Sequence, residues 1–130
     1  MNRKRQLHQS LIIAGRYLYV FFGMVTETLL SNSIECLDLM EKSAGFQDVI
    51  LHSDDQRKGR FFDRPLFYKF SENTLDASAK LLIFGGFRGD CHEIENGKSE
   101  VFSLILSSET DEGPMAELTL VSKQLIWSFT

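Results

Sequence analysis

Two short apolar runs that end on glycine are the most regular feature of the hydrophobic pattern. Residues 18–23 read LYVFFG and residues 81–86 read LLIFGG, so the runs lie 63 residues apart, the difference between 81 and 18. A second apolar segment with a glutamate near its start follows each run, and the two glutamates, Glu35 and Glu100, lie 65 residues apart. Self-similarity at a long, nearly constant period predicts a repeat architecture, and a period of this length favours propeller blades over helical solenoids.

Apolar segments of strand length fill the first half of the chain. Residues 9–14 and 17–22 are separated by a Gly-Arg pair, a pattern typical of a β-hairpin with a tight turn. Residues 33–39 form the next predicted strand, and a weaker one follows at 46–51. Four short strands therefore make up the first predicted unit.

The second half of the chain repeats this pattern. Strands are predicted at residues 65–70, 81–84, 100–106 and 116–121. Residues 71–80, between the first two of these, contain several turn-forming side chains, so they form either a long loop or a poor inner strand. The paired glycines after residue 84 mark the clearest strand end, because glycine admits positive φ without steric strain.

These segments predict an all-β chain with two four-stranded antiparallel units. The first unit spans residues 1–52, a charged connector spans 53–64, and the second unit spans 65–122. Residues 123–130 are predicted to begin a third, incomplete unit. The connector carries mixed charges without an apolar period, which is typical of a solvated segment, and a docking loop is the alternative.

Composition supports strands and argues against two classes of partner. Of the 130 residues 43% are hydrophobic and eleven are phenylalanine, a residue that suits the half-buried surface of a pleated sheet. A formal net charge of -4 gives no general attraction for phosphate backbones or anionic membranes. No segment approaches the ~20 apolar residues of a membrane helix. We therefore expect neither a nucleic acid nor a membrane as partner.

The N-terminus and the cysteines predict a cytoplasmic protein. Residues 1–5 are basic and precede apolar residues, which is the outline of a secretory signal, but the apolar run at 11–14 is too short and a Gly-Arg pair interrupts it. Cys36 falls in a predicted strand and Cys91 in a charged loop. We interpret both as free thiols of a reducing compartment.

Side chains that could carry catalysis are sparse. His8, His52 and His92 lie far apart and none has a metal-ligand spacing, so we predict no catalytic residue, cofactor or metal site. The loop at 90–95 does concentrate a thiol, an imidazole and carboxylates, which are metal-ligand types. Adjacent residues on an irregular loop rarely converge on one ion, so a solvated loop tip is the favoured interpretation.

The order of these residues resembles a kelch repeat. In that family a four-stranded antiparallel blade has a double glycine after its second strand, an aliphatic-Glu-x-aromatic-Asp third strand, and an aromatic residue, usually Trp, at the start of the fourth. A carboxylate at a repeated strand position favours a structural role, with a backbone amide or a neighbouring arginine as its partner. The positions that carry the resemblance are Gly23, Glu35, Asp38 and Phe46 in the first copy and Gly85, Gly86 and Glu100 in the second.

Both copies also depart from the kelch pattern. Phe22 stands where the first glycine is expected, Phe46 replaces the usual Trp, and Ser103 replaces the Asp of the second copy. The units are longer than the family's usual ~50 residues. The resemblance implies a β-propeller ring that this chain alone does not close, because rings usually have ~4 to 8 blades. We therefore expect a piece of a longer propeller, an incomplete gene product, or a subunit that exposes apolar blade faces and self-associates.

The resemblance implies a non-catalytic module that binds another protein, as a scaffold or a substrate receptor. Its contacts are expected on loops between strands, at residues 24–32, 71–80 and 88–98. The predicted partner-binding residues are Arg16, Thr28, Arg88 and His92. Two alternatives are a galactose-oxidase-like copper enzyme, which needs tyrosine and histidine ligands, and a plain β-sandwich without a repeat function.

Overall fold

The predicted all-β fold is confirmed. A computed structural model describes residues 8–23, 33–53, 61–62, 66–84, 87–88 and 101–122 of the chain. Within these ranges every regular element is a strand except η1 (Lys42–Ala44), a single turn of 3-10 helix. In the same part of the chain, no helix has the length and apolar character to cross a membrane.

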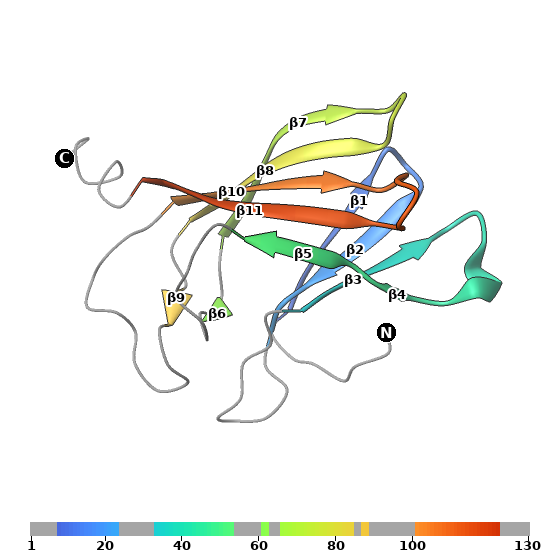
Figure 1. The fold of residues 1–130 in the computed structure, drawn as a ribbon, viewed down its shortest axis with the longest axis horizontal. Helices are drawn as coiled ribbons and strands as arrows, with labels where there is room; N and C mark the ends of the chain where they lie inside the picture. Colours follow the sequence, from blue (N-terminus) through green and yellow to red (C-terminus); the bar gives the residue numbers. More distant parts are fainter. Residues whose placement is uncertain are drawn as a thin grey trace.

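The first sheet is the predicted four-stranded antiparallel unit. Its strands follow the chain order β1 (Gln9–Ile13), β2 (Tyr17–Phe21), β3 (Ile34–Asp38) and β4 (Gln47–Asp48) (Figure 1). The turn between β1 and β2 has positive φ at both central residues, 56° at Ala14 and 65° at Gly15, and the Arg16 N–H donates to the Ile13 carbonyl at 3.1 Å. This is a type I′ turn, whose twist matches that of the strands it joins. The predicted hairpin is thus confirmed.

The second sheet contains a four-stranded antiparallel meander and one additional strand. The meander consists of β7 (Leu66–Asn73), β8 (Ser78–Phe84), β10 (Val101–Ser107) and β11 (Met115–Ser122). The additional strand β5 (Ile50–Ser53) runs parallel to β11 (Figure 1), so the expected purely antiparallel four-stranded unit is a five-stranded mixed sheet. A separate pair is formed by β6 (Phe61–Phe62) and β9 (Phe87–Arg88). The described strands do not close a propeller ring.

The weak strand predicted at 46–51 is divided between the two sheets. β4 pairs with β3, and the Val49 N–H donates to the Ile34 carbonyl at 2.9 Å. At the next residue the chain changes partner, because the Ile50 N–H donates to the Pro114 carbonyl at 3.1 Å and β5 continues beside β11. The end of the first unit therefore forms one edge of the second sheet.

The ambiguous segment 71–80 is a β-hairpin and not a long loop. β7 runs to Asn73 and β8 begins at Ser78, so only four residues form the turn. The Asn73 side chain accepts a hydrogen bond from the Leu75 N–H at 2.9 Å, and Ala77 has a φ of 54°. Asparagine in such a position imitates a backbone turn, which is why this polar stretch can reverse the chain.

The two sheets pack face to face around one core. We call the faces that meet the inner faces, and the opposite ones the outer faces. Tyr19 and Phe21 of β2 and Leu81 and Ile83 of β8 are completely buried in this core. The rings of Phe21 and Phe67, which come from different sheets, lie 4.9 Å apart between centroids. Aromatic side chains thus supply much of the area that holds the sheets together.

Strand register corrects the predicted period of the repeat. Phe21 pairs with Ile34 in the first sheet, and Phe84, at the same place in the repeat, pairs with Val101 in the second. These partners lie 67 residues apart, the difference between 101 and 34, and not 65. The counterpart of Glu35 is therefore Phe102, and the predicted counterpart Glu100 lies outside the described residues.

The two copies turn opposite faces toward the core. Tyr19 and Leu82 are 63 residues apart and hold the same place in β2 and β8, but Tyr19 lies on the inner face and Leu82 on the outer face. On β8 the inner face belongs to the neighbours Leu81 and Ile83. Because side chains alternate along a strand, one copy is turned over relative to the other at the interface.

Candidate functional site

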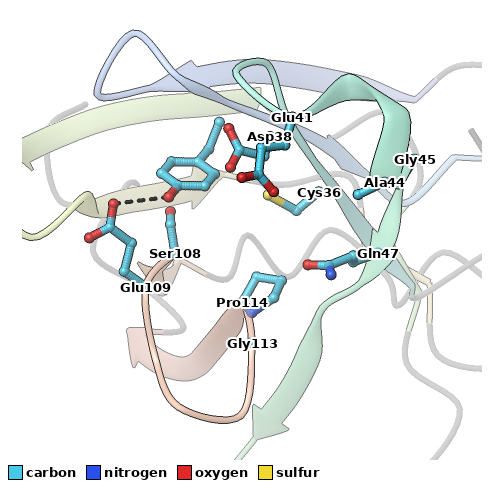
Figure 2. Close-up of a pocket in the computed structure, with 11 residues that line it drawn as sticks. Cys36, Asp38, Glu41, Ala44, Gly45, Gln47, Ser108, Glu109, Gly113 and Pro114 are labelled. Atoms are coloured by element: carbon cyan, nitrogen blue, oxygen red, sulfur yellow. Dashed lines mark hydrogen bonds between the residues drawn. The ribbon is translucent and has the colours of Figure 1, made fainter.

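A crevice opens between the two sheets at the end where their short turns meet (Figure 2). Its volume is about 220 Å³. The first sheet and its loop contribute Tyr17, Asp38 and Gln47, and the loop between β10 and β11 contributes Glu109 and Pro114. The lining combines carboxylates, a phenol and an amide with an apolar proline, so the crevice presents both hydrogen-bonding groups and apolar surface.

Two glycine-ended loops shape the crevice. Gly45 follows η1 with a φ of 73°, and Gly113 precedes Pro114 with a φ of 97°. Each closes its turn with a backbone hydrogen bond of 3.0 Å, to the carbonyls of Lys42 and Thr110 respectively. No atom lies within 4 Å of a Cβ built at either glycine, so a side chain would not clash with its neighbours. Glycine is favoured at both positions because the backbone has positive φ.

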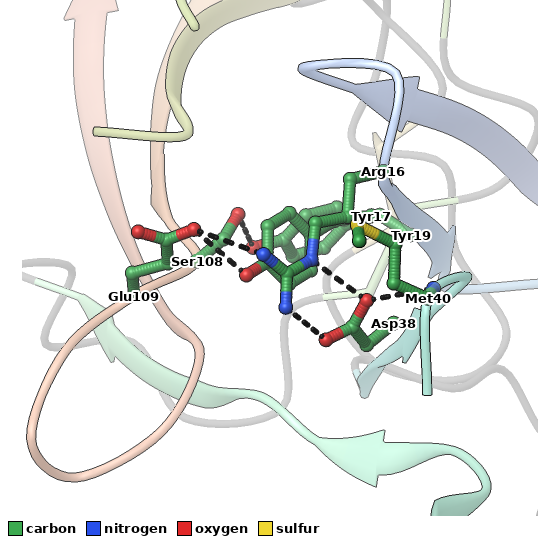
Figure 3. Close-up of polar contacts among 7 residues, drawn as sticks. All are labelled: Arg16, Tyr17, Tyr19, Asp38, Met40, Ser108 and Glu109. Carbon is green, nitrogen blue, oxygen red and sulfur yellow. Dashed lines mark hydrogen bonds and ion pairs between the residues drawn. The ribbon is translucent and has the colours of Figure 1, made fainter. Parts of the chain in front are cut away.

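An arginine–aspartate pair lies beside the crevice, and its aspartate, Asp38, belongs to the lining. Figure 3 shows the contacts of this pair. Arg16 Nε donates to Asp38 Oδ1 at 2.9 Å, and Nη2 donates to Oδ2 at 2.7 Å. The Met40 N–H also donates to Asp38 Oδ1, at 3.0 Å. The guanidinium hydrogen bonds hold the pKa of Asp38 below its ordinary value. Arg16, which we predicted to bind a partner, lies next to the crevice lining, and its planar group is already paired bidentately with Asp38.

Glu109 connects this pair to the second sheet. Its Oε1 accepts a hydrogen bond from the Tyr17 hydroxyl at 2.9 Å and lies 3.8 Å from Arg16 Nη1 (Figure 3). Burial, and then the hydrogen bond to Glu109, raise the pKa of Tyr17 to about 12. The Arg16 guanidinium also lies 5.0 Å from the centre of the Tyr17 ring, within cation–π range. Residues 92 positions apart in the chain are thus neighbours in this site.

A second tyrosine makes a buried contact deeper between the sheets. The hydroxyls of Tyr19 and Ser108 lie 2.7 Å apart in a hydrogen bond, and Tyr19 is completely buried. Cys36 lines the crevice nearby, and burial raises the pKa of its thiol to about 11. The thiol is therefore protonated at neutral pH and is a poor nucleophile. The prediction that Cys36 is a free thiol is confirmed, and its side chain is buried in the core.

We expect Tyr19 and Ser108 to be energetically coupled. Tyr19→Phe removes one hydroxyl and deprives the buried Ser108 hydroxyl of this partner, so it should lower the free energy of unfolding by about 1–3 kcal/mol. Ser108→Ala should have a similar effect, and the double variant should lose less than the sum. Urea unfolding of the four proteins measures this difference. Strictly additive losses would show that the hydrogen bond does not contribute to stability.

The other predicted motif residues of the first copy lie in or beside the first sheet. Gly23 is buried just after β2 and has a φ of 97°. Glu35 is completely buried in β3 on the outer face, and Phe46 is half-buried before β4. Of these motif residues only Asp38 lines the crevice, and it pairs with Arg16.

Of the remaining predicted positions the structure describes Arg88. It belongs to β9, in the pair with β6 and away from the sheet of β1 and β2 that flanks Arg16. The remaining predicted positions lie outside the described residues: Thr28, Gly85, Gly86, His92, Glu100, Cys91, and the loops 24–32 and 90–95. Of the four predicted partner-binding residues the structure describes two, Arg16 in the turn between β1 and β2 of the first sheet and Arg88 in the separate pair of β6 and β9.

Candidate metal ligands do not gather in the described residues. His8 precedes β1 and His52 lies in β5, on different sheets. Tyr17 and Tyr19 bind Glu109 and Ser108, and Tyr68 is exposed on β7. In this part of the chain no group of three or more His, Cys, Asp or Glu side chains is placed to hold an ion.

Sequence reasoning missed Tyr17, Ser108 and Glu109 as site residues. The segment that contains Ser108 and Glu109 has the composition of an ordinary polar loop, and nothing in it points to a tyrosine in another unit. Comparison with known proteins does not identify these site residues either. No family model matches the sequence, and no curated protein or solved structure is significantly similar to the chain.

Proposed function

We propose that this chain is a kelch-type, non-catalytic module that binds another protein. The observation that carries the proposal is the stacking of the two sheets by opposite faces. Successive propeller blades are related by rotation about one axis, so each blade places one face on the opposite face of the next. Two halves of a sandwich related by a two-fold axis would instead join like faces. The inner positions of Tyr19 and Leu81, and the outer position of Leu82, support the blade relation.

The backbone after β2 gives independent support. The kelch pattern has two glycines at this place, and here Phe22 and Gly23 both have positive φ, 53° and 97°. A side chain in the left-handed region costs roughly 1–2 kcal/mol, which is why glycine is the usual residue there. Positive φ at two successive residues is a conformation that glycine favours, so the backbone at this place supports the kelch interpretation.

β5 is a departure from the kelch-type blade. A blade of that family has four antiparallel strands, whereas β5 continues from the first sheet and adds a parallel strand to the second. This strand covers the β11 edge, which would otherwise expose unpaired backbone groups. The departure concerns one edge of the second sheet and leaves the meander order of both sheets unchanged.

The rim around the crevice is the proposed binding surface. Short loops on a rigid sheet scaffold meet there, and such loops commonly carry recognition residues. The loop between β10 and β11 carries Glu109, Asp111 and Glu112, and Arg16 is already paired with Asp38. The rim is therefore predominantly acidic, and a partner segment with lysine or arginine would be complementary to it.

A charge reversal on the rim tests this function. The full chain, immobilised, is used to capture proteins from a lysate, and each captured protein is then purified and its affinity measured. Glu112→Lys on the exposed loop should weaken the binding of a rim-dependent partner by about tenfold or more. Glu117→Lys makes the same change of charge at an exposed position of β11 and should leave this affinity unchanged. If no captured protein distinguishes the two variants, the proposed binding surface is wrong.

A further inference from the structure

The crevice between the sheets has a buried floor and an exposed mouth. Tyr17, Ser108 and Pro114 are buried and form the floor, whereas Glu41 and Glu109 are exposed and form the mouth. Figure 2 shows these side chains around one opening. The crevice volume of about 220 Å³ is below the ~300–1,000 Å³ that sites for drug-sized ligands usually have. The crevice therefore has the size for a single side chain of a partner.

The charge of the crevice selects a cation. Three of its lining residues are acidic, Asp38, Glu41 and Glu109, and within the described part of the chain no lysine, arginine or histidine belongs to the lining. Arg16 lies beside the lining and neutralises one of these charges, because its guanidinium donates to both oxygens of Asp38. The crevice keeps a net charge of about -2, three carboxylates less one guanidinium, and so attracts a positively charged side chain.

The arrangement of the carboxylates favours lysine over arginine. A guanidinium is planar and binds a carboxylate bidentately, and at Asp38 this place is already taken by Arg16. The other two carboxylates lie on separate elements, with Glu41 before η1 and Glu109 after β10, and one Glu109 oxygen accepts the Tyr17 hydroxyl. An ammonium group is compact and has three rotatable donors, so it suits single acceptors that come from different directions.

The floor of the crevice suits the hydrocarbon stem of a lysine. The Tyr17 ring and Pro114 offer it apolar surface. Lysine side chains bury their methylene groups on such surface and keep the ammonium near water. The mouth allows this, because the side chain of Glu109 is 47% exposed. An ammonium at the mouth keeps part of its hydration, which avoids the large cost of burying a charge.

We propose that the crevice receives one lysine side chain of a protein partner, with the stem on the floor and the ammonium between the carboxylates of Glu41 and Glu109. The inference rests on the proposed function, because it takes the rim as the surface where the partner binds. It adds which side chain of the partner is recognised and which groups of this chain recognise it.

Binding of a lysine derivative to the full chain tests this recognition. N-acetyl-lysine methylamide is the probe, and the corresponding norleucine derivative keeps most of the hydrocarbon stem but lacks the ammonium. In NMR titrations at low salt, the lysine probe should bind with a dissociation constant on the order of 1 mM and shift the amide signals of Ser108 and Gly113 in the crevice lining. The norleucine derivative should bind about tenfold more weakly, and the arginine derivative about threefold more weakly.

Matched substitutions locate the ammonium. Glu41→Gln and Glu109→Gln each remove one charge with little change of size, and each should weaken the binding of the lysine probe by about threefold to fivefold, because both pairs are partly exposed. Glu117→Gln makes the same change at an exposed position of β11 outside the crevice lining and should leave the affinity unchanged. If thermal unfolding shows that Glu109→Gln is destabilised, Glu41→Gln decides.

Three results would overturn the proposal: equal binding of the lysine and norleucine derivatives, equal or tighter binding of the arginine derivative, or no loss of affinity in Glu41→Gln. The rim test of the proposed function is separate. If a captured protein distinguishes Glu112→Lys from Glu117→Lys while the lysine probe does not bind, this inference is wrong and the proposed function stands. If the probe binds in the crevice and no captured protein distinguishes these variants, the proposed function is wrong and only the recognition of lysine stands.

Discussion

Phe22→Ala should lower the free energy of unfolding by about 3–5 kcal/mol, and Phe22→Gly should be about 1 kcal/mol less harmful. Phe22 is only 1% exposed, and its ring stacks on Phe67 of the second sheet at 6.2 Å between centroids. Both substitutions remove the buried ring. Residue 22 has a φ of 53°, so alanine keeps a Cβ in the left-handed region, whereas glycine has no Cβ and avoids the steric strain.

The unusual order of the two variants is what identifies the strain. Phe21 is the matched control, because it is completely buried and contacts the same Phe67 ring. It is the last residue of β2, where it pairs with Ile34 and has no positive φ. In a strand interior glycine is ordinarily less stable than alanine by about 0.5–1 kcal/mol. Urea unfolding should therefore rank alanine above glycine at Phe21 and glycine above alanine at Phe22. The same ranking at both positions would contradict the double-glycine interpretation.

The positive φ at Phe22 also has a packing consequence. Successive residues of a strand point to opposite faces, so Phe22 would be expected on the outer face if Phe21 lies on the inner one. Instead both rings contact Phe67. The left-handed residue at the strand end places a second aromatic ring in the core, and the burial of that ring outweighs the backbone strain.

Leu104→Ala should lower the free energy of unfolding by about 3–5 kcal/mol, whereas Ile105→Ala should lower it by about 1 kcal/mol or less in the monomer. Leu104 is completely buried between the sheets, and Ile105, the next residue of β10, is 40% exposed on the outer face. Removing buried atoms from a central strand leaves a cavity, because its neighbours β8 and β11 cannot move together. Removing exposed atoms leaves none.

Thermal unfolding of the two variants at high dilution measures this difference. Only Leu104→Ala should show a large shift of the midpoint. Equal losses of stability for the two variants at high dilution would mean that the assignment of the inner and outer faces of β10 is wrong.

The polar contacts of the crevice connect the two sheets at one end. Glu109, in the loop after β10, accepts a hydrogen bond from the Tyr17 hydroxyl and lies near the Arg16 guanidinium. The neighbouring Ser108 hydroxyl is hydrogen-bonded to the Tyr19 hydroxyl. On the first sheet the bidentate pair of Arg16 with Asp38 fixes the position of the guanidinium. The shape of the proposed binding rim therefore depends on how the sheets are placed relative to each other.

Local pattern was sufficient for the strands and insufficient for their partners. The hairpin of β1 and β2 follows from alternating apolar residues around a glycine turn, and both features lie within 13 adjacent residues, 9–21. The division of residues 47–53 between β4 and β5 cannot be predicted from local pattern, because it depends on the position of β11 in the second sheet. The pairing of Tyr17 with Glu109 is likewise invisible in the sequence, because nothing local relates residues 92 positions apart.

The sequence by itself determined that the chain is all-β and contains two copies of an apolar run that ends on glycine. Both follow from short-range physics: the alternation of apolar side chains and the backbone freedom of glycine. Only the tertiary structure decided that Tyr19 faces inward while its counterpart Leu82 faces outward. Both faces of each copy carry apolar residues, so the pattern alone suits either orientation, and the choice depends on which surfaces fit when the two sheets pack.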